Sequence, residues 1–168
     1  MRFKGGKHLA VLHELGSPRV REAIERYLAL VGGDSRPTQD QALQALAAAL
    51  DDLIAGLRGL PAGECPNDPA DAPEGAYETL YAEAASRFPM LGDYPSADPI
   101  DLEDQDILVG DAIDDISDIA SDLSEALWWW DRCGDSAGAW WVRFNFQAHW
   151  GRHLFDLRRH VHAKLWLA

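Results

Sequence analysis

The chain has 168 residues, of which 47% are hydrophobic, and its 28 acidic and 15 basic side chains give a formal net charge of −13. This length and composition fit one globular domain with its own core and exclude a largely disordered chain. The negative charge argues against general binding to nucleic acid or to anionic membranes, because both partners require a basic surface.

The cellular compartment is inferred from what the sequence lacks. It contains no apolar run near the ~20 residues needed to cross a bilayer, and no secretory signal opens it. Cys65 and Cys133 have no CxxC partner and fall in predicted loops, so we expect two reduced thiols, with one bridge between them as the alternative. We therefore predict a cytoplasmic protein with no membrane partner.

Residues 1–16 differ from the rest of the chain because they are basic and interrupted by glycine. We interpret them as an N-terminal extension, either native upstream sequence or vector-derived. Residues 17–168 contain no internal repeat or break in composition, so we interpret them as a single domain.

Helical periodicity and capping residues predict three helices in the first half of this domain. The first begins at Ser17 and ends at Gly32. The second follows Thr38, whose spacing from Gln41 fits a capping box. The third is shorter and lies between two proline-containing segments that we predict to be loops, residues 61–75 and 89–106.

Two long helices are predicted in the C-terminal half. One runs from about Asp106 to Asp131 and carries an apolar stripe opposite an acidic one. The other runs from near Ser136 almost to the end of the chain, and the connection between the two is short. Helices joined in this way pack as antiparallel neighbours. We therefore predict an all-α fold, a single-domain bundle of about five helices around two long antiparallel C-terminal helices.

The acidic stripe allows two interpretations. We interpret it as a solvated helix face, with binding of a divalent cation or a basic partner as the alternative. The spacing of an EF-hand loop is absent. The stripe consists of Asp111, Asp115, Asp118, Asp122 and Glu125.

A polar line on the last predicted helix is the main candidate for chemistry. Each helical residue advances by about 100°, so four polar side chains fall within about 60° of one another. They are His149, His153, Asp156 and His160. Two imidazoles one turn apart can share a metal ion, with Asp156, Asp115 or Asp118 completing the site.

Two alternatives to this metal site remain open. The imidazoles could hydrogen-bond to Asp115, Asp118 or Asp122 across the helix interface, and we favour this interpretation because no signature such as H-E-x-x-H is present. Acid–base chemistry without a metal would pair His149 or His153 with Asp115 or Asp118. No activated nucleophile or Gly-rich phosphate loop marks a substrate site, so the sequence leaves enzymatic activity undecided and favours a non-catalytic role.

Four tryptophans suggest a binding surface at the turn between the two long helices. Trp128, Trp129, Trp140 and Trp141 lie on either side of that turn. Because successive helical residues fan around the axis, Trp129 falls on the acidic line and is expected to be exposed unless something covers it. Exposed aromatic clusters are typical of interfaces, and the alternative is a local cap on the bundle.

Three motifs resemble a bacterial family known as domain of unknown function 5063. They are the run D-I-L-V-G-D-A-I-D-D-I-S-D-I-A-S-D-L from Asp106 to Leu123, the paired W-x-x-x-F and H-W-G-R-H motifs at residues 140–153, and F-P-x-L-G-x-Y-P at residues 88–95. The resemblance covers roughly residues 18 to 165 and implies a helical fold but no particular activity. The chain departs from the family at Ala120, where the resemblance implies an aromatic residue.

Two hypotheses of function follow. The first is a non-catalytic interaction or oligomerisation module without a cofactor, which binds itself as a homodimer or another protein through the tryptophan surface. The second is a metal-dependent or His/Asp acid–base enzyme in which His149 and His153 point toward Asp115 or Asp118. The sequence favours the first.

Overall fold

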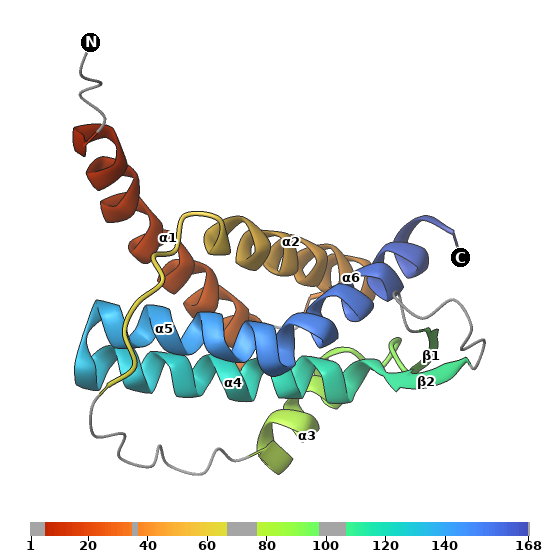
Figure 1. The fold of residues 1–168 in the computed structure, drawn as a ribbon. Helices are drawn as coiled ribbons and strands as arrows, with labels where there is room; N and C mark the ends of the chain where they lie inside the picture. The colour runs from red at the N-terminus through yellow and green to blue at the C-terminus, as the bar shows by residue number, and fades with distance from the viewer. Residues whose placement is uncertain (1–5, 35–36, 67–76, 98–106, 168) are drawn as a thin grey trace.

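The computed structural model describes residues 6–34, 37–66, 77–97 and 107–167, with side chains from residue 19 onward. It confirms the predicted all-α bundle and adds one small sheet (Figure 1). The elements are α1 (Gly6–Gly32), α2 (Gln39–Leu57), α3 (Tyr77–Arg87), β1 (Asp93–Ser96), β2 (Leu108–Asp111), α4 (Ala112–Cys133), α5 (Asp135–Asn145), the π-helical turn η1 (Phe146–Trp150) and α6 (Gly151–Trp166).

Helix α4 is the centre of the arrangement. After the tight connection at Gly134, α5, η1 and α6 run back along α4, as the short connection predicted (Figure 1). Helix α4 also contacts α1 and α3, while α2 packs against α1 and α6. None of the helices in the described part of the chain is long and apolar enough to cross a membrane.

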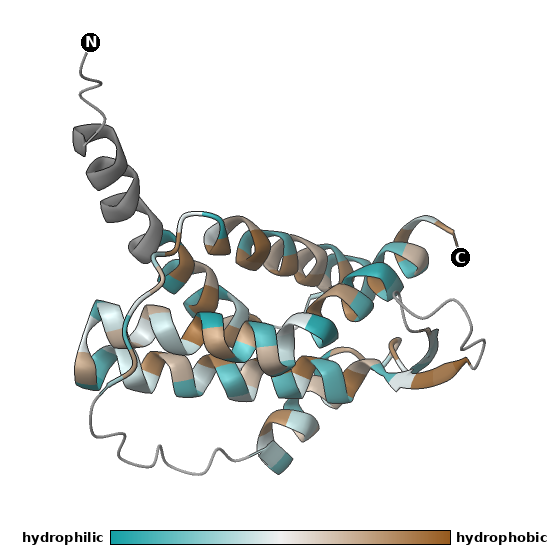
Figure 2. Ribbon diagram, viewed as in Figure 1, coloured by the Kyte–Doolittle hydropathy of each residue, from teal (hydrophilic) through white to brown (hydrophobic). Residues whose placement is uncertain are grey.

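The apolar stripe of α4 forms the middle of the core. Ile116, Ile119 and Leu123 are fully buried in one cluster with side chains of α1, α2 and α6. Figure 2 shows apolar and polar positions mixed along the described helices, as expected for helices with one buried face. The buried Tyr27 hydroxyl of α1 donates a hydrogen bond to the Ile116 carbonyl oxygen at 3.1 Å, which ties α1 to the same stripe.

The start of α4 differs from the prediction. The helix begins at Ala112 instead of near Asp106 because Leu108–Asp111 pairs with Asp93–Ser96 as an antiparallel strand. The Asp111 carboxylate then accepts a hydrogen bond from the Ile113 backbone N–H at 2.9 Å and caps the helix. Strand pairing depends on a segment that is distant in the sequence, so helical periodicity cannot predict it.

The start of α1 also differs from the prediction. Helix α1 begins at Gly6, so Ser17 lies inside it and does not start it. The helix extends past the capping signal at Ser17 because residues 7–15 contain mostly good helix formers.

The capping box predicted for α2 is confirmed, with Thr38 and Gln41 exchanging both hydrogen bonds. Cys65 and Cys133 are exposed and free.

Gly63 provides a test of how the segment after α2 is held on α5. Its φ is +71°, and an added Cβ would lie 2.3 Å from the Ser136 carbonyl oxygen and 2.4 Å from the Trp140 backbone nitrogen. We expect Gly63→Ala to lower the free energy of unfolding by about 1–3 kcal/mol, because both the dihedral angle and the contact oppose a side chain. Urea denaturation measures this. Gly92→Ala is the control, since nothing lies within 4 Å of its added Cβ, and an equal effect of both substitutions would contradict the prediction.

Candidate metal centre

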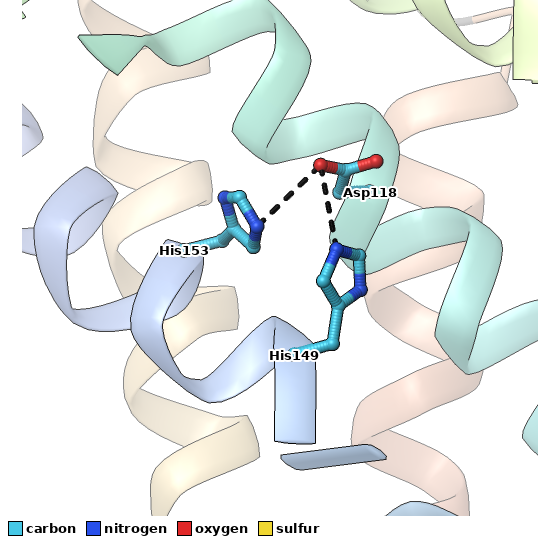
Figure 3. Close-up of side chains that lie close together, drawn as sticks. All are labelled: Asp118, His149 and His153. Atoms are coloured by element: carbon cyan, nitrogen blue, oxygen red, sulfur yellow. Dashed lines mark ion pairs between the residues drawn. The ribbon is translucent and has the colours of Figure 1, made fainter. Parts of the chain in front are cut away.

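Three side chains meet where the acidic face of α4 lies against η1 and α6. Asp118 comes from α4, His149 from η1 and His153 from the first turn of α6 (Figure 3). One ligand atom of each lies within 4.8 Å of the others. Among the residues that the structure describes, this is the one group of three metal-ligating side chains with such spacing.

Both imidazoles direct one nitrogen toward the same carboxylate oxygen. The Oδ2 atom of Asp118 lies 3.5 Å from Nε2 of His153 and 3.8 Å from Nε2 of His149. A hydrogen bond between such atoms spans about 2.7–3.2 Å. Ligand atoms around a tetrahedral zinc ion, with bonds of about 2.0–2.2 Å, lie roughly 3.3–3.5 Å apart. Neither distance to Asp118 is therefore a direct hydrogen bond; the His153 distance matches the spacing around a shared cation, and His149 would have to move slightly closer to bind the same ion.

The second nitrogen of each ring is held by a different carboxylate. Nδ1 of His149 lies 2.8 Å from Oδ2 of Asp122, and Nδ1 of His153 lies 2.7 Å from Oδ1 of Asp115. A carboxylate accepts hydrogen bonds, so each Nδ1 carries a proton and the neutral ring has its lone pair on Nε2. Metal-binding histidines are oriented by carboxylates in the same manner.

Asp115 fixes the position of His153. Its side chain is 7% exposed, and besides His153 it accepts a hydrogen bond from the Tyr94 hydroxyl. Tyr94 lies in β1, which the strand pairing holds beside the first turn of α4. Since a buried carboxylate is costly without partners, these two hydrogen bonds constrain both donors.

The π-helical turn sets the position of His149. In η1 the Gly151 N–H reaches back to the Phe146 carbonyl oxygen, five residues earlier. An added Cβ on Gly151 would lie 2.2 Å from that oxygen, so this turn requires glycine. The closest contact of such a Cβ would therefore be with the backbone of its own π-turn and not with another helix. Such turns occur often at functional sites.

The site holds carboxylates whose charge is incompletely balanced. Burial raises the pKa of Asp118, and repulsion from Asp114 raises it further, while the two imidazoles lower it. Burial also raises the pKa of Asp122 in spite of the hydrogen bond from His149. The hydrogen bond to Asp115 raises the pKa of His153. A cation among these groups would offset the cost of burying the carboxylates.

Two members of the predicted polar line lie outside this cluster. Asp156 accepts a hydrogen bond from the Ser96 hydroxyl at 3.0 Å. The His160 ring stacks on Tyr94 with centroids 4.6 Å apart, and burial lowers its pKa. Both residues lie closer to the C-terminal end of α6, past the part of α6 that faces the first turn of α4. In this region the element next to α6 is β1. The line of four residues is therefore divided between two environments.

Sequence reasoning placed Asp115 and Asp118 in the candidate metal site and named Asp122 as a possible hydrogen-bond partner of the imidazoles, but it gave no role to Tyr94. Asp122 had a signal, since it lies four residues after Asp118 on the acidic stripe. Tyr94 had none, because its contact with Asp115 depends on the pairing of β1 with β2.

The tryptophan end of the bundle is more covered than predicted. Trp129, expected to be exposed, is 2% exposed because Trp141 of α5 stacks on it with ring centroids 4.9 Å apart. Trp128, Trp140 and Trp141 are half-buried. Of the aromatic side chains in this group, Phe144 is the most open, at 49% exposure, and its ring stacks on Trp140. The local cap that the sequence left as an alternative therefore accounts for much of the cluster.

Comparisons with known proteins give a family and a fold. The model of a family described as Domain of unknown function (DUF5063) matches residues 19–166. A comparison with curated proteins finds no match. The crystal structure of protein BF1032 from Bacteroides fragilis is similar with a TM-score of 0.70 and 18% sequence identity, over 88% of this chain and 93% of that chain. At this identity the likeness concerns the fold alone.

The raised pKa of His153 predicts how stability depends on pH without metal. Asp115 and Asp118 raise this pKa and Arg152 lowers it. The stabilisation that protonated His153 gives the folded state is complete below the pKa of the unfolded chain, about 6.5. It is lost as the pH rises through the pKa of His153 in the folded protein. We expect melts in EDTA to give a lower Tm at pH 8 than at pH 6, with a smaller difference in His153→Gln. The exposed His162→Gln should keep the original difference, and an unchanged difference in His153→Gln would contradict the assignment.

Proposed function

The chain belongs to the family described as Domain of unknown function (DUF5063), and we propose that it binds a divalent transition-metal ion, with Zn²⁺ as the first candidate, through Asp118, His149 and His153. One observation carries the proposal. Both imidazoles turn Nε2 toward a single oxygen of Asp118, while separate carboxylates hold both Nδ1 atoms. The geometry thus supports the second hypothesis from the sequence more strongly than the first.

The ligand types favour a first-row transition metal. Imidazole nitrogen suits Zn²⁺, Fe²⁺, Ni²⁺ and Cu²⁺, whereas Mg²⁺ and Ca²⁺ prefer oxygen ligands. Three protein ligands leave a coordination position open, which is the arrangement of catalytic zinc sites, whereas structural zinc sites have four. A metal bound there would polarise a coordinated water and lower its pKa to about 7.

The chain's own residues have defined parts in this proposal. Asp115 and Asp122 orient the two imidazoles and keep their Nε2 lone pairs available. His149 has a 47% exposed side chain, against 19% for His153, so the open side of the site faces solvent past His149. A substrate or water would therefore approach from that side. The negative charge of the surrounding α4 face favours cation uptake.

Metal content and metal-dependent melting test the proposal. We expect the untagged protein to contain close to one zinc ion per chain by inductively coupled plasma mass spectrometry. Free Zn²⁺ about 100-fold above Kd should raise the free energy of unfolding by ~2.7 kcal/mol over that in a chelator. Asp122→Asn, which weakens one orienting contact, should lower the affinity about 10–100-fold. Removing a direct ligand, as in His149→Ala, His153→Ala or Asp118→Asn, should lower it further.

Two further variants, together with Asp118→Asn, separate metal binding from folding. His162→Ala removes an exposed imidazole of the same helix and should leave zinc affinity unchanged. Asp118→Asn removes a carboxylate whose pKa is raised by burial and repulsion, so the metal-free fold should tolerate it. Gly151→Ala keeps every ligand but disturbs the π-turn, and it should weaken zinc binding. A protein without metal that does not respond to Zn²⁺, Fe²⁺, Mn²⁺ or Ni²⁺ would reject the proposal.

Self-association through the aromatic end of the bundle is the second candidate function. It is favoured by the exposed ring of Phe144, which stacks on Trp140 with centroids 5.0 Å apart. A copy related by a two-fold axis would face this pair with the same pair, and aromatic pairs contribute about 0.5–1.5 kcal/mol beyond burial.

Light scattering after size-exclusion chromatography tests this second candidate. We expect a concentration-dependent dimer that Phe144→Ser shifts toward monomer by at least about tenfold in Kd, a loss of about 1.4 kcal/mol. Phe155→Ser is the matched control, because Phe155 on α6 has a similar exposure of 54%. A monomer at every concentration would exclude this function.

A further inference from the structure

A cavity separate from the metal centre lies between the end of α1, the start of α2 and one face of α3. Its volume is about 680 Å³, within the range of about 300–1,000 Å³ typical of small-molecule sites. Helix α3 contributes positions three and four residues apart, from Glu78 to Arg87, and α1 contributes its last turn. None of the groups that form the metal centre lines it.

Negative charge gathers at this cavity. Among the described residues, its lining includes the carboxylates of Asp34, Glu78 and Glu83 and one basic side chain, Arg87. Helix α1 ends there at Gly32 with no basic residue in its last turn. The last carbonyl groups of a helix carry a partial negative charge. The cavity is therefore suited to a positively charged ligand.

Glu83 strengthens this inference because of where it lies. Its Oε2 atom is 3.1 Å from the position that a Cβ on Gly32 would occupy, and Glu83 is half-buried. A carboxylate at the C-terminal end of a helix is unfavourable, since like partial charges meet. The start of α2 also reaches the cavity, at Gln39. Its partial positive charge is already balanced, because its first turn contains the capping box and Asp40. A cation between Glu83 and the α1 carbonyl groups would relieve the repulsion.

Apolar side chains form part of the wall, beside the polar side chains of Gln39, Thr79 and Ser86. Val31, Ala82, Pro89 and Met90 contribute hydrocarbon surface, and Val31 is fully buried beneath the cavity. A hydrated metal ion gains little from such surface, whereas an aliphatic chain is stabilised by it. Acidic groups at one end and apolar groups beside them fit an ammonium group on an aliphatic chain.

We propose that this cavity binds a small organic cation, an aliphatic di- or polyamine. One ammonium group lies between Glu83 and the terminal carbonyl groups of α1, where it donates hydrogen bonds to both. The chain of methylene groups lies along Ala82 and Met90, and the second ammonium group pairs with Glu78 or Asp34. An anionic ligand of the same size is rejected by the three carboxylates.

Titration calorimetry with putrescine tests this site, at about 150 mM salt so that weak surface attraction to the acidic protein is screened. We expect one putrescine per chain and no heat with succinate, a dianion of similar length. Glu83→Gln should weaken binding at least tenfold. Ala82→Leu, which fills the wall of the cavity without changing charge, should also weaken it and serves if Glu83→Gln is poorly folded.

Two controls separate this site from general charge effects and from the metal centre. Glu64→Gln makes the same charge change at an exposed position outside the cavity and should leave putrescine binding unchanged. Asp118→Asn, which removes a proposed zinc ligand, should also leave it unchanged. Absence of heat up to millimolar putrescine, an unaltered affinity in Glu83→Gln and Ala82→Leu, or equally strong binding of Mg²⁺ at the same residues would each overturn the proposal.

Discussion

The buried carboxylate of Asp115 is the contact on which the candidate centre depends. It accepts hydrogen bonds from Tyr94 of β1 and His153 of α6, so one side chain of α4 joins three elements. A buried charge that loses its partner costs several kcal/mol. The short strand and the C-terminal helix are therefore held in register by the same group. His153 acquires both its orientation and its raised pKa from this contact.

The π-helical turn is the second constraint, and it acts on His149 alone. A regular α-helix through residues 146–151 would rotate the preceding segment relative to α6 and move the His149 ring. The turn persists because Trp150 is fully buried and Gly151 leaves room for the Phe146 carbonyl oxygen. Two independent devices, a buried carboxylate and a π-turn, thus bring two imidazoles toward Asp118. A helix interface that served packing alone would need neither the buried carboxylate nor the π-turn.

The sequence was sufficient for much of the fold because most contacts are made by regular helices. The apolar stripe of α4 and the short connection at Gly134 together predict the antiparallel core. Facing stripes of aspartate and histidine also predict that His149 and His153 meet carboxylates. The strands, the role of Tyr94 and the separation of His160 depend on where α4 begins, which is set by pairing between β1 and β2. The π-turn and the burial of Trp129 likewise arise from tertiary packing. Neither can be predicted from a local sequence pattern.

The charges at the centre can be balanced by a proton or by a metal ion. Without metal, the Nδ1 proton of His153 is donated to Asp115 and a second proton on Nε2 faces Asp118, while burial leaves the pKa of Asp118 and Asp122 raised. Metal ligands must be deprotonated, so the proposed metal ion would replace that second proton and supply two charges in its place. Lower pH would then favour the protonated network, and higher pH would favour the metal-bound one. An ordinary surface ion pair is worth about 0–1 kcal/mol and does not impose this competition. The competition arises because two oriented imidazoles converge on one half-buried carboxylate.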